Sequence, residues 1–336
     1  QGGVGMQIYI ISKSDLKVKD IAETISCEIN EDVSTAAQSG FVLASFVNAA
    51  TGDFVYSRET YLGIVMGIEA DKKTSVFTLR TLPASSIFLR NILLGSAQAI
   101  TENYMMSAIN DNFVDSGDAL LDIPYINVAV NTQTELNIAP DNSNGIYNLD
   151  LFLRYTAMRH NIFTDFELTS DSLNVSIENR TPPTHIIDAT VADVLGVNET
   201  VVSECVSKVT VKTSTVVLTY YLFDDGSYST ESSAGTRVSG KVETIYCANE
   251  GDAEKAAGDV FAKNKYSHLI ELEMLSSSKL YNVNNMQLYD RAKVKTKTGI
   301  YDTYISFKST KSAAQTVLFK FGDAKLSLTD KLKGGA

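Results

Sequence analysis

The segment that decides the fold class is Asp290-Arg-Ala-Lys-Val-Lys-Thr-Lys-Thr-Gly-Ile-Tyr-Asp-Thr-Tyr-Ile-Ser-Phe307, followed by Gln315-Thr-Val-Leu-Phe-Lys-Phe-Gly322. Apolar and polar side chains alternate on both sides of Lys297-Thr-Gly299, which predicts a β-hairpin. A third strand is expected after the polar turn at 308–314, and a further strand at 325–329. Short antiparallel strands joined by tight turns are typical of a small barrel.

A similar pattern occurs earlier in the chain, in Asp53-Phe-Val-Tyr-Ser-Arg-Glu-Thr-Tyr-Leu-Gly-Ile-Val-Met-Gly-Ile-Glu69 and the strand-like run Ser75-Val-Phe-Thr-Leu79. The repetition indicates two copies of one barrel module. The predicted fold class is mainly β with an α+β insertion: two similar small antiparallel β-barrels plus an acidic α/β middle domain.

Three domains are expected. The first β-barrel covers residues 6–95, with a helix at 15–25, and the acidic α+β insertion covers 96–200, with a helix near 149–160. Pro182-Pro183 marks a bend after which the chain returns to barrel packing near 181–200. The second β-barrel covers 201–333 with a covering helix at 252–264, for which Asp252 is the expected N-cap. The apolar stripe that would face the barrel is Ala253, Ala256, Ala257, Val260 and Phe261.

Charge is distributed unevenly along the chain. The formal net charge is −11, but residues 96–200 hold fifteen Asp and Glu, three Arg and no Lys, a net charge of −12. Such a field repels a phosphate backbone, so we expect no sequence-specific nucleic-acid binding. Residues 291–336 are basic, with a net charge of +7. These lysines either bind an acidic partner or form a solvated barrel face that guards strand edges.

The residues that could carry chemistry are few and scattered. No Gly-rich phosphate loop, nucleophile elbow or His-Glu-x-x-His motif is present. The odd cysteine count argues against a disulfide framework. We therefore predict no catalytic, cofactor-binding or metal-binding residues, no cofactor and no enzymatic activity. The histidines and cysteines are His160, His185, His268, Cys27, Cys205 and Cys247. Asp141-Asn-Ser-Asn-Gly145 fails the calcium-loop spacing and is predicted to be a polar loop tip.

The order of several segments along the chain resembles that of the tail hub, or baseplate hub, proteins of long-tailed bacteriophages and prophages, and of the N-terminal hub module of tail-associated lysins. The resemblance spans nearly the whole chain. It is carried by Gly63-Ile-Val-Met-Gly-Ile-Glu69, Asp165-Phe-Glu-Leu-Thr-Ser-Asp-Ser-Leu173, the hairpin at 216–226, the helix at 250–265, Gly299-Ile-Tyr-Asp-Thr303 and Leu328-Thr-Asp-Lys331.

The resemblance implies a structural tail protein. Three chains, each with two barrels, would form a pseudo-hexameric ring that closes the distal tail tube and anchors tip or receptor-binding components. The expected partners are copies of the chain itself, distal tube proteins and tip proteins, without membrane insertion. The protein would be made in the bacterial host cytoplasm and reside in the virion tail.

Two alternatives stay open at this stage. The chain could be the non-catalytic hub part of a tail-associated peptidase or lysin, which a reading frame continuing past Ala336 into a hydrolase domain would favour. It could also be a receptor-binding adhesin, with some of its sixteen tyrosines lining a sugar-binding face. Under the hub hypothesis, the acidic residues 96–200 should supply most of the axial surface, because a channel for DNA benefits from repelling phosphate.

Overall fold

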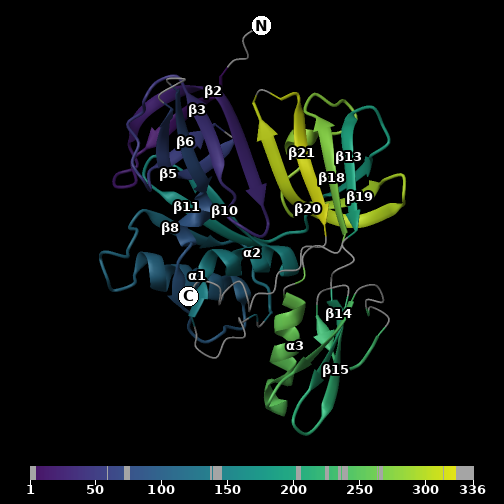
Figure 1. The fold of residues 1–336 in the computed structure, drawn as a ribbon. Coiled ribbons are helices and arrows are strands. Elements are labelled where there is room, and N and C mark those ends of the chain that lie inside the picture. Colours follow the sequence, from purple (N-terminus) through teal and green to yellow (C-terminus); the bar gives the residue numbers. More distant parts are fainter. Residues whose placement is uncertain are drawn as a thin grey trace.

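The computed structural model describes residues 5–58, 60–71, 76–136, 138, 146–201, 206–223, 227–233, 236, 241–262, 264, 268–312 and 314–322. It is mainly β and has four bodies: two six-stranded barrels side by side, an α+β insertion against the first barrel, and a small α/β domain beyond the second (Figure 1). The predicted fold class is confirmed. Within the described residues, no helix is both long and apolar enough to cross a bilayer.

The first barrel is closed, because its strands pair in the ring order β1-β2-β3-β6-β5-β4 and β4 returns to β1. Phe41, Leu43, Val65 and Leu79 are fully buried in its interior. The strands are β1 (Gln7–Ile11), β2 (Val18–Asp32), β3 (Ser39–Leu43), β4 (Phe54–Ser57), β5 (Tyr61–Asp71) and β6 (Val76–Pro83).

The helix expected at 15–25 is wrong, since this stretch belongs to the 15-residue strand β2. Cys27 and Ile29 alternate with more exposed residues and are buried in the barrel core, while a β-bulge between Thr24 and Ser26 interrupts the alternation. A bulge shifts the side-chain period by one residue, and that shift hides a strand from pattern reading.

The insertion follows β6 and packs against the first barrel. Its three-stranded sheet has the order β10-β11-β8, with β8 parallel to β11, and the short strands β7 and β9 form a separate pair. The elements are η1 (Ala84–Phe88), β7 (Asn91–Leu93), α1 (Thr101–Ile109), the π-helical η2 (Asn110–Val114), β8 (Ile126–Val130), β9 (Ile146–Asn148), α2 (Leu149–His160), β10 (Ile162–Leu168) and β11 (Leu173–Asn179).

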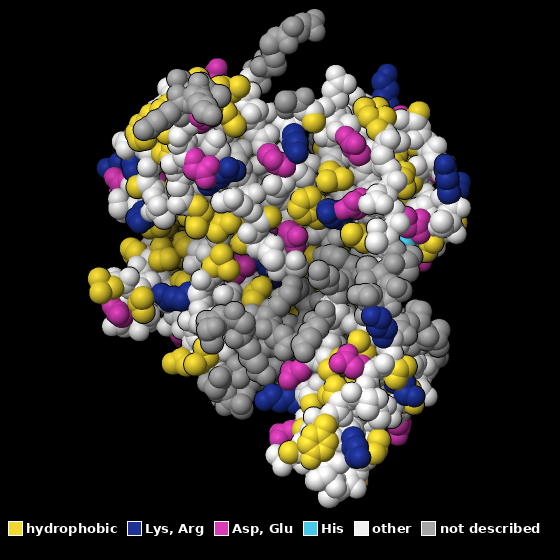
Figure 2. Space-filling view, viewed as in Figure 1, with side chains coloured by type: hydrophobic (Ala, Val, Ile, Leu, Met, Phe, Trp, Pro, Cys, Tyr) yellow, Lys and Arg dark blue, Asp and Glu magenta, His cyan; other side chains and the backbone are white. Residues whose placement is uncertain are grey.

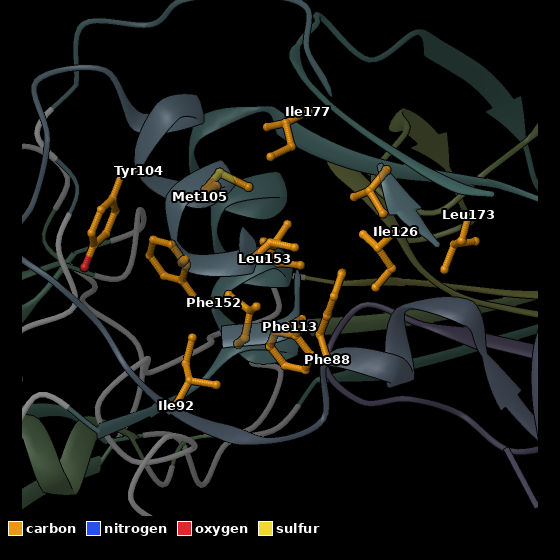
Figure 3. Packing of buried hydrophobic residues seen from close by; sticks show 14 of the residues in the cluster. Phe88, Ile92, Tyr104, Met105, Phe113, Ile126, Phe152, Leu153, Leu173 and Ile177 are labelled. Atoms are coloured by element: carbon orange, nitrogen blue, oxygen red, sulfur yellow. The ribbon is translucent and has the colours of Figure 1, made fainter. Parts of the chain in front are cut away.

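A large apolar core holds the insertion together, with Phe88, Met105, Phe113 and Phe152 pointing into it (Figure 3). Burying side chains of this kind contributes about 1.5–3 kcal/mol each relative to an exposed position. The core continues onto the first barrel through Phe54, which lies edge-on to Tyr125 at a ring distance of 6.1 Å. The insertion and the first barrel therefore share one core.

Helix α2 begins and ends where the sequence predicts. The side chain of its N-cap, Asn148, accepts a hydrogen bond from the backbone N–H of Leu151 at 3.2 Å. At the other end Asn161 adopts the left-handed conformation, with φ of 54°. Asparagine suits both positions, because its side chain caps N-termini and it tolerates positive φ.

The second barrel has six strands in the order β12-β19-β20-β21-β18-β13. The predicted hairpin is confirmed, with β19 and β20 antiparallel and Thr296 N–H bonded to the Gly299 carbonyl at 2.8 Å. Its strands are β12 (Thr184–Asp188), β13 (Val194–Val201), β18 (His268–Leu275), β19 (Arg291–Lys295), β20 (Ile300–Lys311) and β21 (Thr316–Gly322), with the 3₁₀ turn η4 (Val283–Asn285). The strand expected at 325–329 and the loop 141–145 lie outside the described residues.

The two barrels use the same order of strands along the chain. In each, the last three strands form a meander, β4-β5-β6 and β19-β20-β21. The last strand then pairs with the third, β3 or β18, and the third with the second, β2 or β13. The barrels differ in how their first strand, β1 or β12, is paired. Strand β1 pairs antiparallel with both β2 and β4. Strand β12 is parallel to β19, and no pairing joins β12 to β13 in the described part of the chain.

The small domain is inserted between β13 and β18. Its strands have the order β16-β15-β14-β17, and one face of this sheet is covered by α3. The elements are β14 (Val206–Lys212), β15 (Val217–Leu222), β16 (Tyr228–Ser229), β17 (Lys241–Tyr246), η3 (Glu250–Asp252) and α3 (Ala253–Ala262).

The expectation that the helix at 252–264 covers the second barrel is wrong. Ala253, Ala257, Val260 and Phe261 pack on Val209, Val211, Tyr220 and Leu222 of β14 and β15 instead. Four of the five predicted residues are buried, while Ala256 is half-buried, and the stripe packs against the strands that precede it in sequence. Figure 1 shows α3, β14 and β15 together below the second barrel.

Candidate functional site: the junction between the two barrels

The two barrels are joined by strand pairing. Beyond its own barrel, β2 continues and pairs antiparallel with β20, from Glu28 opposite Lys311 to Asp32 opposite Phe307. Backbone bonds extend the junction at both ends, from Val33 N–H to the Ser306 carbonyl and from Ser312 N–H to the Cys27 carbonyl, each 3.0 Å long. One sheet therefore runs from the first barrel into the second, and backbone hydrogen bonds fix their relative orientation.

The insertion clamps this junction through Arg154 on α2. The guanidinium is buried and donates from Nε to Asp150 Oδ2 at 2.8 Å, from Nη1 to the Asp32 carbonyl at 2.7 Å and from Nη2 to Ser85 Oγ at 3.0 Å. Arginine suits this position because its planar fork offers five donors in fixed directions. Burial acts to lower the pKa of Arg154, but the charge of Asp150 and the smaller contributions of its other neighbours together outweigh burial, so the pKa is raised. The side chain thus stays cationic.

The second barrel contributes Tyr289 to the same place. Tyr289 adopts a positive φ of 70°, which costs roughly 1–2 kcal/mol for a residue other than glycine. Its backbone N–H bonds to the Ile305 carbonyl at 2.9 Å, and its ring lies edge-on to Phe163 of β10 at 5.8 Å. Burial raises the pKa of Tyr289 to about 12, so the phenol stays neutral. The strained backbone therefore aims an uncharged ring at the insertion.

A cavity of about 650 Å³ lies where the first barrel, the insertion and the second barrel meet. Its wall includes Glu31, Phe163, Arg180 and Lys308. Among the charged groups on its wall, Arg180 is paired within the chain. The Arg180 guanidinium stacks on Phe163 and forms ion pairs with Asp165 and Glu178. Burial raises the pKa of Glu31, and the charge of Lys308 partly offsets this.

The acidic residues of the segment 96–200 divide into two groups. Several are satisfied inside the chain: Glu102 accepts from Thr132 and Thr134, and Asp188 forms an ion pair with Lys295 at 2.7 Å. A second group, Asp111, Asp115 and Asp118, is exposed in the segment 111–122, where the half-buried Asp122 accepts hydrogen bonds from Ser116. On the face drawn in Figure 2, acidic and basic side chains are interspersed.

Lysines of the second barrel have partners on neighbouring strands. Lys320 lies 2.6 Å from Glu271, Lys311 lies 3.2 Å from Glu28 across the junction, and Lys308 donates to the Met286 carbonyl at 2.8 Å. Of the two alternatives for the basic segment, these contacts favour a barrel surface that satisfies its own charges.

The histidines and cysteines lie in different parts of the structure. His160 ends α2, His185 in β12 bonds to Asp290 at 2.8 Å, and His268 in β18 bonds to Glu199 at 2.9 Å. Cys27 is buried in the first barrel, and Cys247 in the small domain donates to the Asn249 carbonyl. Cys205 lies outside the described residues. Among the residues that the structure describes, no three His, Cys, Asp or Glu side chains gather as metal ligands would.

No protein-family model and no curated protein matches the sequence. The fold does match solved structures. The tail protein from Neisseria meningitidis MC58 is 11% identical, with a TM-score of 0.51, over 95% of this chain and 96% of that one. The prophage MuSo2 43 kDa tail protein from Shewanella oneidensis is 12% identical, with a TM-score of 0.52, over 95% and 98%. A chain of the phage P2 baseplate in its activated conformation is 11% identical, with a TM-score of 0.54, over 95% and 98%. The resemblance inferred from the sequence is thus confirmed in three dimensions: this chain has the fold of phage and prophage tail and baseplate proteins.

Proposed function

We propose that the protein is a structural component of a phage or prophage tail, a hub without catalytic activity that resides in the virion tail. Three chains form a ring in which six barrels alternate around the axis. The observation that carries this proposal is the pair of barrels with the same strand order, fixed to one another by the β2–β20 pairing and the Arg154 clamp.

Symmetry explains why a chain of this design is useful. Two similar barrels per chain let three chains present six similar units, which suits a six-fold tube, while the chain as a whole retains three-fold symmetry for a tip complex. Closed rotational symmetry satisfies every repeated interface without a separate linker protein. The partners are therefore copies of the chain, tube proteins on one side and tip or receptor-binding proteins on the other.

Residues 96–200, which comprise most of the insertion together with β12 and nearly all of β13, are proposed to supply an acidic axial surface. Three copies of residues 96–200 bring a charge of −36, three times −12. Basic walls would hold DNA through counterion release, whereas acidic walls repel phosphate and let it pass. The exposed aspartates of the segment 111–122 are the strongest candidates to face the axis.

Sedimentation velocity over a range of chain concentrations tests the oligomeric part of this proposal. A monomer–trimer equilibrium that shifts to trimer at millimolar concentration supports it. A dimer or an open-ended series of larger species contradicts it. Binding of the isolated chain to host-wall polysaccharide would instead favour an adhesin.

A further inference from the structure

The two barrels carry β-bulges at matching places, and these fix a residue-by-residue correspondence. In the pairing of β5 with β6 the register shifts between Val65 and Gly67, and in that of β20 with β21 it shifts between Ile305 and Phe307. Val65 and Ile305 are both fully buried. Aligning the bulges places 67–70 of β5 on 307–310 of β20.

A second pair of bulges aligns the other strands. The register shifts between Thr24 and Ser26 where β2 pairs with β3, and between Val194 and Gly196 where β13 pairs with β18. Residues 28–31 of β2 therefore correspond to 198–201 of β13. Bulges are specific features of a fold rather than random defects, so two matching pairs support this alignment.

The corresponding segments differ in what they pair with. Residues 28–31 of β2 and 308–311 of β20 pair with each other and form the junction inside the chain. Their counterparts, 198–201 of β13 and 68–71 of β5, pair on one side with β18 and β6. Along the opposite side of each counterpart, no strand of the described part of the chain is paired. Such an edge is a template for another strand.

Two residues of β20 at the junction are buried, whereas their counterparts in β5 are exposed. Ser306 and Ser309 are 0% and 4% exposed at the intramolecular junction. Their counterparts in β5 are Met66, which is 47% exposed, and Glu69, whose side chain is 65% exposed. Met66, an apolar side chain at the bulge, is thus left in solvent, whereas Ser306 at the equivalent position of the second barrel is buried.

We propose that residues 198–201 of β13 in one chain pair antiparallel with residues 68–71 of β5 in a second copy, continuing between chains the β2–β20 junction that joins the barrels within a chain. The inference rests on the proposed ring and assigns its interface. Because Asn30 lies opposite Ser309, Thr200 of one chain is expected opposite Glu69 of the next. The contact is head-to-tail, a type that closes into a ring when the repeated rotation allows it.

Disulfide trapping in the full-length chain tests the pairing. Directly opposed antiparallel residues have Cα atoms about 4.5–5.5 Å apart, within the range that a disulfide bridges. The test variant is Thr200→Cys with Glu69→Cys. Its matched control is Asn30→Cys with Ser309→Cys, which should form a disulfide within one chain. Thr200→Cys with Glu254→Cys, which places the second cysteine on α3, controls for random oxidation, and the single variants account for bonds to native cysteines.

Oxidation at millimolar chain concentration should convert the Thr200→Cys/Glu69→Cys chain to covalent trimer on non-reducing gels, and dithiothreitol should reverse it. A trimer by sedimentation without this crosslink overturns the strand pairing and leaves the ring intact. No association at that concentration overturns the ring and the pairing together.

A surface variant gives an independent readout. Met66→Asp should lower the trimer fraction several-fold at fixed concentration and leave the melting temperature of the dilute chain unchanged, because Met66 is exposed in the single chain. Val18→Asp, at a position that is 55% exposed on β2, is the matched control and should leave the trimer fraction unchanged. Equal trimer fractions in the two variants contradict the proposed interface.

Discussion

Arg154 Nη1 donates a hydrogen bond of 2.7 Å to the backbone carbonyl of Asp32, a residue 122 positions earlier in the chain. Asp32 is the last residue of β2 and the last to pair with β20. The end of a strand that leaves its barrel would otherwise present unsatisfied backbone groups to a partly buried joint. Arg154 therefore satisfies the strand end and ties the insertion to the place where the barrels meet.

Removing this side chain should destabilise the protein strongly. Arg154→Met leaves Asp150 buried without its cation, and breaking one partner of a buried ion pair costs about 3–5 kcal/mol. Urea unfolding should show a clearly lower midpoint than for Arg159→Met on the same helix. Similar midpoints for the two variants would mean that the clamp contributes little.

Replacing both partners should recover part of that loss. In Asp150→Asn/Arg154→Met neither charge remains, so the penalty for an unpaired buried carboxylate disappears. Asp150 already has one buried oxygen, Oδ1, without a hydrogen-bond partner among the described residues. The double variant should unfold at a higher urea concentration than Arg154→Met alone, and a lower midpoint would contradict this reading of the pair.

Phe261→Ala should destabilise the small domain rather than the barrels. Phe261 is 4% exposed and packs against Tyr228 at a ring distance of 5.4 Å. Truncating a buried phenylalanine costs about 3–5 kcal/mol. Hydrogen exchange should speed up in β14, β15 and α3, with β20 and β21 unchanged. The exposed Lys255→Ala is the control, and equal exchange in the two variants would show that Phe261 is not packed as described.

Stability should depend on pH through Glu199. Burial acts to raise its pKa, but hydrogen bonds from Thr298, Thr296 and His268 outweigh this and lower the pKa from 4.5 to about 2. A carboxyl whose pKa is depressed by folding stabilises the protein above its unfolded pKa, and that stability is lost as pH falls. The melting temperature of Glu199→Gln should thus lie below that of the unmodified chain at pH 7, and the gap should close between about pH 4.5 and 2. A gap independent of pH would exclude this role.

The chain should show no hydrolase activity on peptidoglycan, peptides or glycans. This expectation rests on the missing catalytic motifs and on the scattered positions of His160, His185 and His268. A wall-substrate zymogram should stay opaque at the position of the chain. Clearing that disappears when a single Asp, Glu, Cys or His is substituted would contradict it.

Local patterns in the sequence predict the elements whose signals are uninterrupted. The hairpin at 296–299 and helix α2 follow from strict alternation and from Asn148 and Asn161 at the helix ends. Strand β2 is missed because its bulge breaks the alternation near Ser26. The packing partner of α3 is predicted wrongly because an amphipathic stripe shows which face of a helix is buried but not which strands cover that face. The closeness of α3 to β14 and β15 in the sequence would have indicated the correct strands.

The junction could not be predicted residue by residue. Arg154 looks like an ordinary helical arginine with an acidic residue four positions before it, a pattern common on exposed helices. Its contacts with Asp32 and Ser85 depend on how three bodies meet. Tyr289 likewise gives no local sign of positive φ, since the neighbouring fold imposes that conformation. The repetition of the barrel, by contrast, is visible in the sequence, because strand order and turns are encoded locally.

Electron cryo-microscopy of the chain assembled at millimolar concentration would test the proposed ring. The proposed hub arrangement predicts three copies around one axis, six barrels alternating in the ring, β13 of each copy beside β5 of the next, and an axial surface that is predominantly acidic and supplied largely by residues 96–200. A ring in which the two barrels of a chain occupy unrelated positions, or a lumen lined by lysines with the acidic insertion pointing outward, would contradict it.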